Sequence, residues 1–295
     1  MSARRFDPRT GLVVAVLAVS TSAILIRWSD APPVVAAFYR VLFTTALVAP
    51  VALGRHADRL SALSGRDLLA AALTGVALSV HFAAWFESLS WTSVAASVTL
   101  VQSHPLFVAV GAWLVLDERV DGRTAVGVVV AVAGMAVMSL GDLLGGGVGA
   151  APLYGNALAA VGGLMTAGYL LAGRSLRQRL PLFPYVAVVY GVAAACLLGF
   201  AVASGAPVRG YPAHEWLLFL AMAVGPGVFG HTVLNWALEH VESSLVSVSL
   251  LGEPLGSALL ALVILSEVPS AATLLGGTVV LVGVAATARA RSSGD

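Results

Sequence analysis

Long apolar runs, separated by short polar or Gly/Pro-rich connections, follow one another along the whole chain. About 20 mainly apolar residues are needed to cross the hydrocarbon core of a bilayer as a helix. Runs of roughly this length predict ten transmembrane helices, at residues 11–28, 34–53, 67–86, 93–115, 124–140, 154–173, 185–203, 216–236, 244–265 and 271–288. We therefore expect an all-α integral membrane protein without a soluble domain, in which the first run is an uncleaved helix rather than a signal peptide.

The second half of the chain repeats the first. Four residues recur 149 positions later: Pro105, Glu118, Gly127 and Gly134 return as Pro254, Glu267, Gly276 and Gly283. Each half, residues 1–145 and 146–295, carries five of the predicted helices, with a Gly-rich linker between the halves. Because five is odd, the second half must enter the membrane from the opposite side. This predicts two inverted five-helix repeats around a central cavity, an arrangement common in alternating-access carriers.

Composition agrees with a surface that faces lipid. Hydrophobic residues make up 59% of the chain and charged residues 11%, with a mean hydropathy of +0.93, whereas a soluble domain carries about 25% charged residues. The net charge of +1 offers no basic stripe for nucleic acid. The single cysteine, Cys196, lies in an apolar run, so neither a disulfide nor a cysteine-based metal cluster is available.

Arginine placement predicts the orientation. All 16 basic residues are arginine; with both termini inside, 13 fall on the cytoplasmic side and Arg209 alone lies in an outer loop. Arg27 and Arg40 belong to the first two predicted helices. An excess of basic residues in cytoplasmic segments is the positive-inside rule. We expect a multi-pass protein of the bacterial cell inner membrane, embedded in the lipid bilayer with cytoplasmic N- and C-termini, as a monomer or weak homodimer.

A doubled motif connects the chain with a known family. In residues 95–134 an Ala/Ser-rich segment leads through Pro105 to an apolar stretch ending at Glu118 and a glycine-containing helix, and the same order returns in residues 244–283. This pattern resembles two copies of the EamA domain of the drug/metabolite transporter superfamily. The resemblance implies a central cavity lined by helices 1, 3, 4, 6, 8 and 9, with helices 5 and 10 at the periphery. Among members, the chain is most similar to YddG-type exporters of aromatic and other neutral amino acids.

Arg40 is the first candidate for substrate binding. It lies well inside the second predicted helix, with apolar residues on both sides, and its neighbour Tyr39 is a weaker candidate. An ionisable side chain at membrane depth is costly and usually faces the interior of the bundle. A guanidinium can bind a carboxylate through two parallel hydrogen bonds, which suits an amino acid or another organic anion. The alternative is an arginine that reaches outward or stabilises a helix end.

Two repeat-related helices each present an imidazole beside an aromatic side chain. His81 and Trp85 are spaced i, i+4 on the third predicted helix; His231 and Asn235 have the same spacing on the eighth, with Trp236 beside them. Aromatic faces can pack against a substrate side chain, and a neutral imidazole or an amide can accept a hydrogen bond from an ammonium. We expect these residues to line the site, although a single buried histidine is often only a core residue.

Prolines at matching positions predict broken helices. Gln102 and His104 precede Pro105, and Glu253 precedes Pro254. Proline removes a backbone donor and frees the carbonyl four residues earlier, so both helices should open near mid-membrane, where such breaks mark binding sites in carriers. We include Gln102, His104 and Glu253 as candidates, together with Tyr169 on the sixth helix. The alternative is that these proline breaks only shape helix packing and do not mark a binding site. Glu118 and Glu267 lie at span ends, and we interpret them as topological or gate elements.

The sequence carries no recognisable motif for nucleotide binding, metal binding or catalysis. It has no phosphate-binding G-x-x-x-x-G-K-[ST] loop, residues 231–235 do not form H-E-x-x-H, and no Cys/His set has metal spacing. We expect no enzymatic activity, no cofactor and no metal. The prediction is an inner-membrane carrier that exports small metabolites, most simply amino acids, by alternating access. An exporter of another metabolite or drug on the same fold stays open; a membrane-embedded enzyme or lipid-handling protein is disfavoured.

Overall fold

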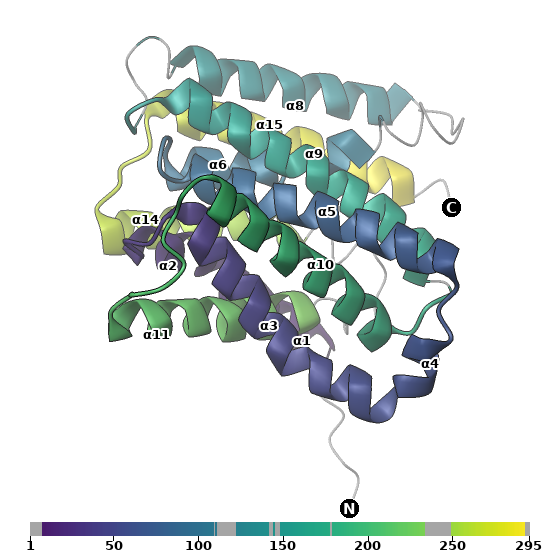
Figure 1. Cartoon of the computed structure of the whole chain (residues 1–295). Helices are drawn as coiled ribbons and strands as arrows, with labels where there is room; N and C mark the ends of the chain where they lie inside the picture. The colour runs from purple at the N-terminus through teal and green to yellow at the C-terminus, as the bar shows by residue number, and fades with distance from the viewer. Residues whose placement is uncertain are drawn as a thin grey trace, which may run out of the picture.

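The computed structural model describes residues 8–108, 110, 122–141, 144, 148–177, 179–233 and 249–292. Every regular element in these residues is a helix, as Figure 1 shows. The elements are α1 Pro8–Ser20, α2 Ser22–Trp28, α3 Pro33–Arg55, α4 Ala57–Ser61, α5 Gly65–Ser88, α6 Val94–Val101, α8 Gly122–Gly141, α9 Pro152–Arg177, α10 Leu182–Ala203, α11 Ala213–Met222, the π-helix η2 Ala223–Thr232, α14 Gly252–Leu265 and α15 Ala271–Ser292.

Length and composition suit a membrane. Six helical stretches of the described chain are long and apolar enough to cross a bilayer: Thr10–Trp28, Pro33–Arg55, Gly65–Ser88, Pro152–Arg177, Leu182–Ala203 and Ala213–His231. Four further apolar helices are shorter: Val94–Val108, Gly122–Met138, Gly252–Leu265 and Ala271–Thr287. All ten of these helices coincide with predicted spans. The all-helical class is confirmed, and the number of ten crossings stays a prediction.

Helix breaks occur beside both Pro105 and Pro254, as the sequence predicts. Helix α6 ends at Val101, and a turn at Gln102 and Ser103 separates it from the helical residues around Pro105. In the second half, a turn at Leu251 directly precedes α14. Because proline lacks the N–H that would continue the helical ladder, both breaks follow from the sequence.

Two further interruptions lie in the first and eighth predicted helices. Thr21 separates α1 from α2; its hydroxyl donates to the Ala18 carbonyl at 2.7 Å, and the Ser20 hydroxyl donates to the Val16 carbonyl at 2.8 Å. Such local side-chain bonds compete with the helical ladder and bend helices. The eighth helix changes from α11 to the π-helix η2, which contains Pro226. The sequence analysis did not predict either interruption.

The helices pack in pairs that connect the two halves of the chain. Helix α5 packs on α9, and α1 packs on η2; α6 packs on α9, and α1 packs on α14. Helix α10 contacts both α3 and α5, while α3 also contacts η2. The interrupted helices α6 and α14 contact each other. Irregular backbone therefore gathers between the halves.

Glycines bring α8 and α15 into close contact at one edge of the molecule (Figure 1). A Cβ atom on Gly283 would lie 2.6 Å from the Gly127 carbonyl oxygen, and one on Gly134 would lie 2.7 Å from the Gly276 carbonyl oxygen. Since Gly127 meets Gly283 and Gly134 meets Gly276, the two helices run antiparallel. Small residues spaced seven apart on one face of each helix allow this close approach.

Candidate functional site

Arg40 lies in the interior of the bundle. Helix α3 begins with Pro33, which suits the first helical position, and continues without a polar residue until Tyr39 and Arg40. The Arg40 side chain is only 2% exposed. Its guanidinium carbon lies 4.7 Å from the centre of the Phe82 ring and 5.6 Å from that of Trp85, distances typical of cation–π contacts. Phe86 lies at 5.7 Å, so one face of α5 surrounds the cation with aromatic rings.

This buried cation has few polar partners. A guanidinium carries five N–H donors. Within the described residues, Ser22 is the hydrogen-bond acceptor of Arg40, at 2.8 Å, and no carboxylate lies within ion-pair distance of it. Ser22 is the first residue of helix α2, directly after the Thr21 break. At this position the Ser22 hydroxyl lies within hydrogen-bond distance of Arg40. A buried charge without a close counter-ion is expensive, which makes Arg40 the clearest candidate for binding an anionic group.

Two more buried polar atoms, near the cluster formed by Arg40 and the aromatic rings of α5, lack hydrogen-bond partners in the described residues. Trp85 is 4% exposed, and its indole Nε1–H donor is buried without a hydrogen bond in the described part of the chain. The same holds for Nδ1 of His104, just after the α6 break. Buried polar atoms in proteins are normally hydrogen-bonded, so exceptions call for an explanation such as a ligand or water.

The ring of His81 is held by the neighbouring helix α9. Its Nδ1 atom lies 3.0 Å from the Gly162 carbonyl oxygen and 2.7 Å from the Thr166 hydroxyl oxygen. The ring also stacks on Trp85 with centroids 5.8 Å apart. Since Trp85 borders Arg40, the imidazole and the guanidinium belong to one cluster, and the two groups interact electrostatically.

The two helix breaks bring Gln102 and Glu253 together. The Gln102 amide donates a hydrogen bond to the Glu253 carboxylate, across 151 residues of sequence. Glu253 is buried, in the first turn of α14, where the helix dipole favours a negative charge. It also interacts electrostatically with Arg40. The site therefore holds a cation and an acid on separate helices.

Four other predicted residues differ in how they are related to this cluster. His231, at the end of η2, interacts electrostatically with both Arg40 and His81. Tyr169 on α9 is close to Tyr190 on α10, which in turn interacts with Arg40. Asn235 and Trp236 lie outside the described residues.

Tyr39 is not part of the cluster, although it is next to Arg40 in sequence. Its hydroxyl donates to the Val208 carbonyl at 2.5 Å, and its ring stacks on Phe219 and meets Trp216 edge to face. These contacts place Tyr39 against α11 and the preceding loop. Consecutive residues of a helix point in different directions, which explains why only one of the two faces the site.

The sequence analysis missed several contributors to the site. Phe82 lies three residues before Trp85 and four before Phe86, the spacings of neighbours on a helix surface. An aromatic stripe was therefore present in the sequence. No comparable signal identified Thr166 or Gly162, because their role arises from the packing of α9 on α5.

At one end of the bundle, Glu267 connects three helices. One carboxylate oxygen lies 2.7 Å from Nη2 of Arg27, at the end of α2, and the other accepts the Val94 backbone N–H at 2.6 Å, at the start of α6. The position of Glu267 depends on the preceding residue, Ser266, which ends α14 in the left-handed conformation with a φ of 54°. The chain then turns back, and the Glu267 N–H bonds to the Ala261 carbonyl. We call this arrangement the Glu267 tie.

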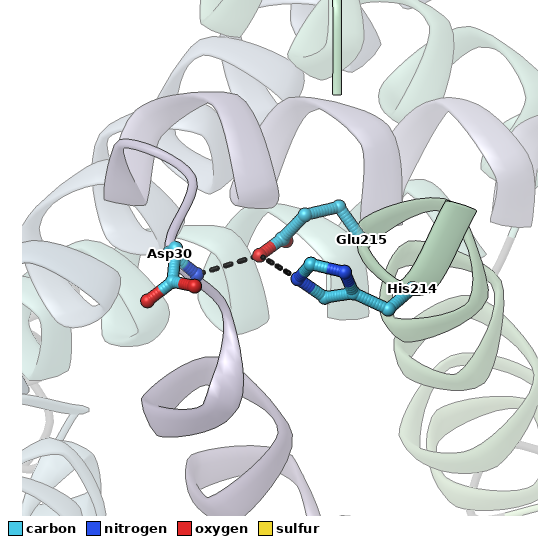
Figure 2. A group of neighbouring side chains, drawn as sticks. All are labelled: Asp30, His214 and Glu215. Atoms are coloured by element: carbon cyan, nitrogen blue, oxygen red, sulfur yellow. Dashed lines mark hydrogen bonds and ion pairs between the residues drawn. The ribbon is translucent and has the colours of Figure 1, made fainter. Parts of the chain in front are cut away.

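A second connection at the same end involves Glu215 (Figure 2). One of its oxygens accepts the Ser29 hydroxyl at 2.6 Å and the other accepts the Asp30 backbone N–H at 2.7 Å, with His214 Nε2 at 3.4 Å. Ligand atoms of Asp30, His214 and Glu215 lie within 4.8 Å of one another. Both Glu215 oxygens already accept protein hydrogen bonds, so the group joins the α2–α3 loop to α11 without needing an ion.

At the opposite end of the bundle, where α5 begins and α9 ends, the described contacts include an exposed ion pair and a ring stack. Arg179, which follows α9, pairs with Asp67 at the start of α5 at 2.9 Å, and its side chain is 53% exposed. The His56 and Phe183 rings stack with centroids 5.7 Å apart. Exposed ion pairs contribute little to stability, so the Arg179–Asp67 pair adds little to the packing of α9 against α5.

Apolar helices with a charged, aromatic cluster between them define a multi-pass membrane protein with a polar interior. The chain belongs to the EamA-like transporter family, whose model matches residues 10–140 and 153–289, so it carries two EamA repeats. It is 28% identical over 277 residues to an uncharacterized transporter of Archaeoglobus fulgidus, covering 92% of this chain and 93% of the relative. A crystal structure with 23% identity has the same fold, with a TM-score of 0.67 over 98% of this chain and 99% of the other. The protein is thus a membrane transporter of small solutes.

Proposed function

We propose that this protein exports small metabolites that carry a carboxylate, most simply aromatic and other neutral amino acids, across the inner membrane. The single observation that carries the proposal is the buried guanidinium of Arg40, which has one hydroxyl partner among the described residues and no close counter-ion. A carboxylate bound to Arg40 would supply the missing charge. Charge-assisted, bidentate hydrogen bonds of this kind are among the strongest in proteins.

The surroundings of Arg40 suit an α-amino acid. The unpartnered indole N–H of Trp85 offers a further donor to the carboxylate. Phe82 and Phe86 present apolar ring surfaces beside the guanidinium, against which an aromatic or aliphatic side chain can pack. Glu253 is an acidic side chain of the same site, complementary to an ammonium. A zwitterion with an apolar side chain satisfies all three environments.

The packing supports ten crossings in two inverted repeats. If helices of the second half are numbered from six to ten, exchanging the halves turns the α5–α9 contact into the η2–α1 contact, and the α6–α9 contact into α14–α1. The α8–α15 and α6–α14 pairs are exchanged with themselves. This is the pattern expected of a two-fold axis in the membrane plane, the architecture used for alternating access around a site at mid-membrane.

Two features support a moving gate. The Glu267 tie joins the ends of α2 and α6 to the α14–α15 connection, and these elements belong to different halves. Its ion pair is only partly exposed, with 27% of the Arg27 side chain and 8% of Glu267 accessible. In an alternating-access cycle the tie closes the outer side while the substrate binds from the cytoplasm, and it opens for release. The excess of arginine at the other end supports cytoplasmic termini.

Flux into proteoliposomes tests the proposal. We expect saturable uptake or counterflow of tryptophan or leucine by the wild type, and a loss of roughly 10–100-fold in apparent affinity for Arg40→Lys, since hydrogen bonds to charged groups contribute about 1.5–3 kcal/mol. Arg209→Lys, in the exposed outer loop, is the control. Because Arg40 is in the core, folded protein must be measured alongside flux.

A second measurement needs no variant. The amide of a transported amino acid has the same side chain and ammonium but no carboxylate. If Arg40 binds the carboxylate, the amide should compete at least ten-fold less well with the wild-type protein, because it removes the charged acceptor. Equal competition by acid and amide, or the absence of saturable flux of any carboxylate-bearing solute, would show that the proposed function is wrong.

A further inference from the structure

Hydrogen bonds made by His81 fix which of its ring nitrogens carries a proton. Both of its described bonds involve Nδ1, with the Gly162 carbonyl at 3.0 Å and the Thr166 hydroxyl at 2.7 Å. A carbonyl oxygen can only accept, so Nδ1 must be the donor toward Gly162. In a neutral imidazole the other nitrogen is then an acceptor. Nε2 of His81 therefore presents a lone pair, and no residue of the described chain bonds to it.

Thr166 stabilises this arrangement from the same helix. Its hydroxyl donates to the Gly162 carbonyl at 3.0 Å, and its oxygen lies 2.7 Å from Nδ1 of His81. The hydroxyl is thus positioned by its own backbone and can accept from the imidazole. Stacking on Trp85 fixes the plane of the ring, with an angle of 24° between the two rings. The orientation of the imidazole is set by three contacts before any ligand binds.

We infer that His81 is a specificity-determining residue whose Nε2 atom accepts a hydrogen bond from a donor on the substrate, and that Thr166 is the residue that positions it. The inference rests on the proposed function, because it takes the substrate carboxylate to be on Arg40. Trp85 contacts both Arg40 and His81, so the acceptor lies beside the carboxylate site. The donor is the α-ammonium group of an amino acid. A carboxylic acid without that group leaves the acceptor unpaired, and sites built around a hydrogen bond discriminate strongly against such analogues.

The test compares two competitors of tryptophan transport: phenylalanine, and 3-phenylpropionate, which lacks only the α-amino group. With wild-type protein, phenylalanine should compete at least ten-fold better. In His81→Asn, the short amide can keep the bond to Gly162 but offers nothing at the Nε2 position, so the preference should fall to within about three-fold of equality. In His81→Gln, the longer amide reaches the Nε2 position with an acceptor oxygen, so much of the preference should return.

Thr166→Val tests the positioning role. It removes the hydroxyl while retaining a similar volume, and we expect a several-fold rise in KM for phenylalanine with the preference reduced and kcat little changed. Thr278→Val is the matched control, because the Thr278 hydroxyl also bonds to its own helix, at the Leu274 carbonyl, on the exposed surface of α15. A purely structural role of Thr166 would instead lower the amount of folded protein without changing the preference.

Each result separates the inference from the function on which it rests. If the wild type transports or binds neither compound, the proposed function fails. If it takes both compounds equally well, or if His81→Asn leaves the preference intact, the carboxylate carrier stands and the role of His81 is overturned. If Glu253→Gln abolishes the preference while His81→Asn retains it, the acceptor is Glu253 and the inference is likewise overturned.

Discussion

Arg27 and Glu267 are 240 residues apart in the chain, yet their side chains form an ion pair at 2.7 Å. The carboxylate also accepts the Val94 N–H at the start of α6, where it interacts favourably with the helix dipole. One side chain thereby joins the ends of three elements. Since Arg27 keeps part of its contact with solvent, the ion pair contributes only modestly to stability, as the opening and closing proposed above requires.

Glu267→Gln should open the end of the bundle that carries the tie. The amide can still accept the Val94 N–H, but the ion pair with Arg27 is lost. In a Cys196→Ser background, a cysteine at Ala95, which is 6% exposed in α6, should react about five-fold faster with a membrane-impermeant thiol reagent, since a partly exposed ion pair contributes roughly 1 kcal/mol. Labelling in intact cells measures this rate.

Glu87→Gln is the control for that experiment, because Glu87 is near the same end and, among the described residues, its carboxylate accepts a local bond from the Trp91 indole, at 2.8 Å. Arg27→Gln should act like Glu267→Gln, and the double variant should add little, as expected for two residues of one interaction. An unchanged labelling rate in both single variants would show that the tie does not control access.

At the residue scale, sequence identified the charged members of the site better than their partners. Arg40 and Glu253 stand out because charge is rare inside apolar spans, and Gln102 because it precedes a proline. Thr166 is an ordinary hydroxyl residue in the sequence, and its importance comes from tertiary contacts. Tyr39 shows the converse: proximity in sequence suggested the site, and packing against Phe219 placed the side chain elsewhere.

The helices themselves differ in how much of their shape is encoded locally. Breaks before Pro105 and Pro254 could be predicted, because proline acts on its own helix. At the Thr21 break, the local hydroxyl bonds are joined by a contact from a distant helix: the Ser20 carbonyl accepts the Ser257 hydroxyl at 3.1 Å, from α14. Gly256, one residue earlier, allows this approach, since a Cβ there would meet Ser20. No local pattern reveals such a contact.

Glycine contacts between α8 and α15 should contribute to stability. In Gly283→Ala, the added Cβ would lie 2.5 Å from the Ala131 amide nitrogen and 2.6 Å from the Gly127 carbonyl oxygen. Backbone atoms cannot move aside as a side chain can, so the two helices must separate. We expect a loss of about 1–3 kcal/mol in the free energy of unfolding, as for other overpacked interiors. Unfolding in mixed detergent micelles measures it.

Gly199→Ala provides the matched control. Gly199 is also helical, in α10, but nothing lies within 4 Å of a Cβ built on it. Alanine has the higher helix propensity, so this variant should be unchanged or slightly more stable. Equal effects of the two substitutions would mean that the close contact between α8 and α15 does not stabilise the fold.

For the whole molecule, the halves are related by sequence and by packing. The family model matches each half separately, and exchanging the halves leaves the observed set of helix contacts largely unchanged. These two relations came from different evidence, the doubled Pro–Glu–Gly motif and the folded chain. Sequence could predict the all-helical membrane class because insertion into a bilayer imposes strict rules on length and charge; the inverted orientation of the two halves stays a prediction. Sequence could not predict which side chains meet at the interface between the halves.

Orientation is the last property that follows from this architecture, and it can be tested directly. In the Cys196→Ser background, a cysteine at Arg209, in the exposed loop after α10, should be labelled by an impermeant thiol reagent in intact cells. A cysteine at Arg59, on the exposed α4, should be labelled only after the membrane is permeabilised. The reason is the distribution of arginine: the end with Arg55, Arg59, Arg66 and Arg179 is favoured to stay in the cytoplasm. If both positions react from the same side, an even number of spans separates the α3–α5 connection from the loop after α10, and the inverted relation of the two halves is lost.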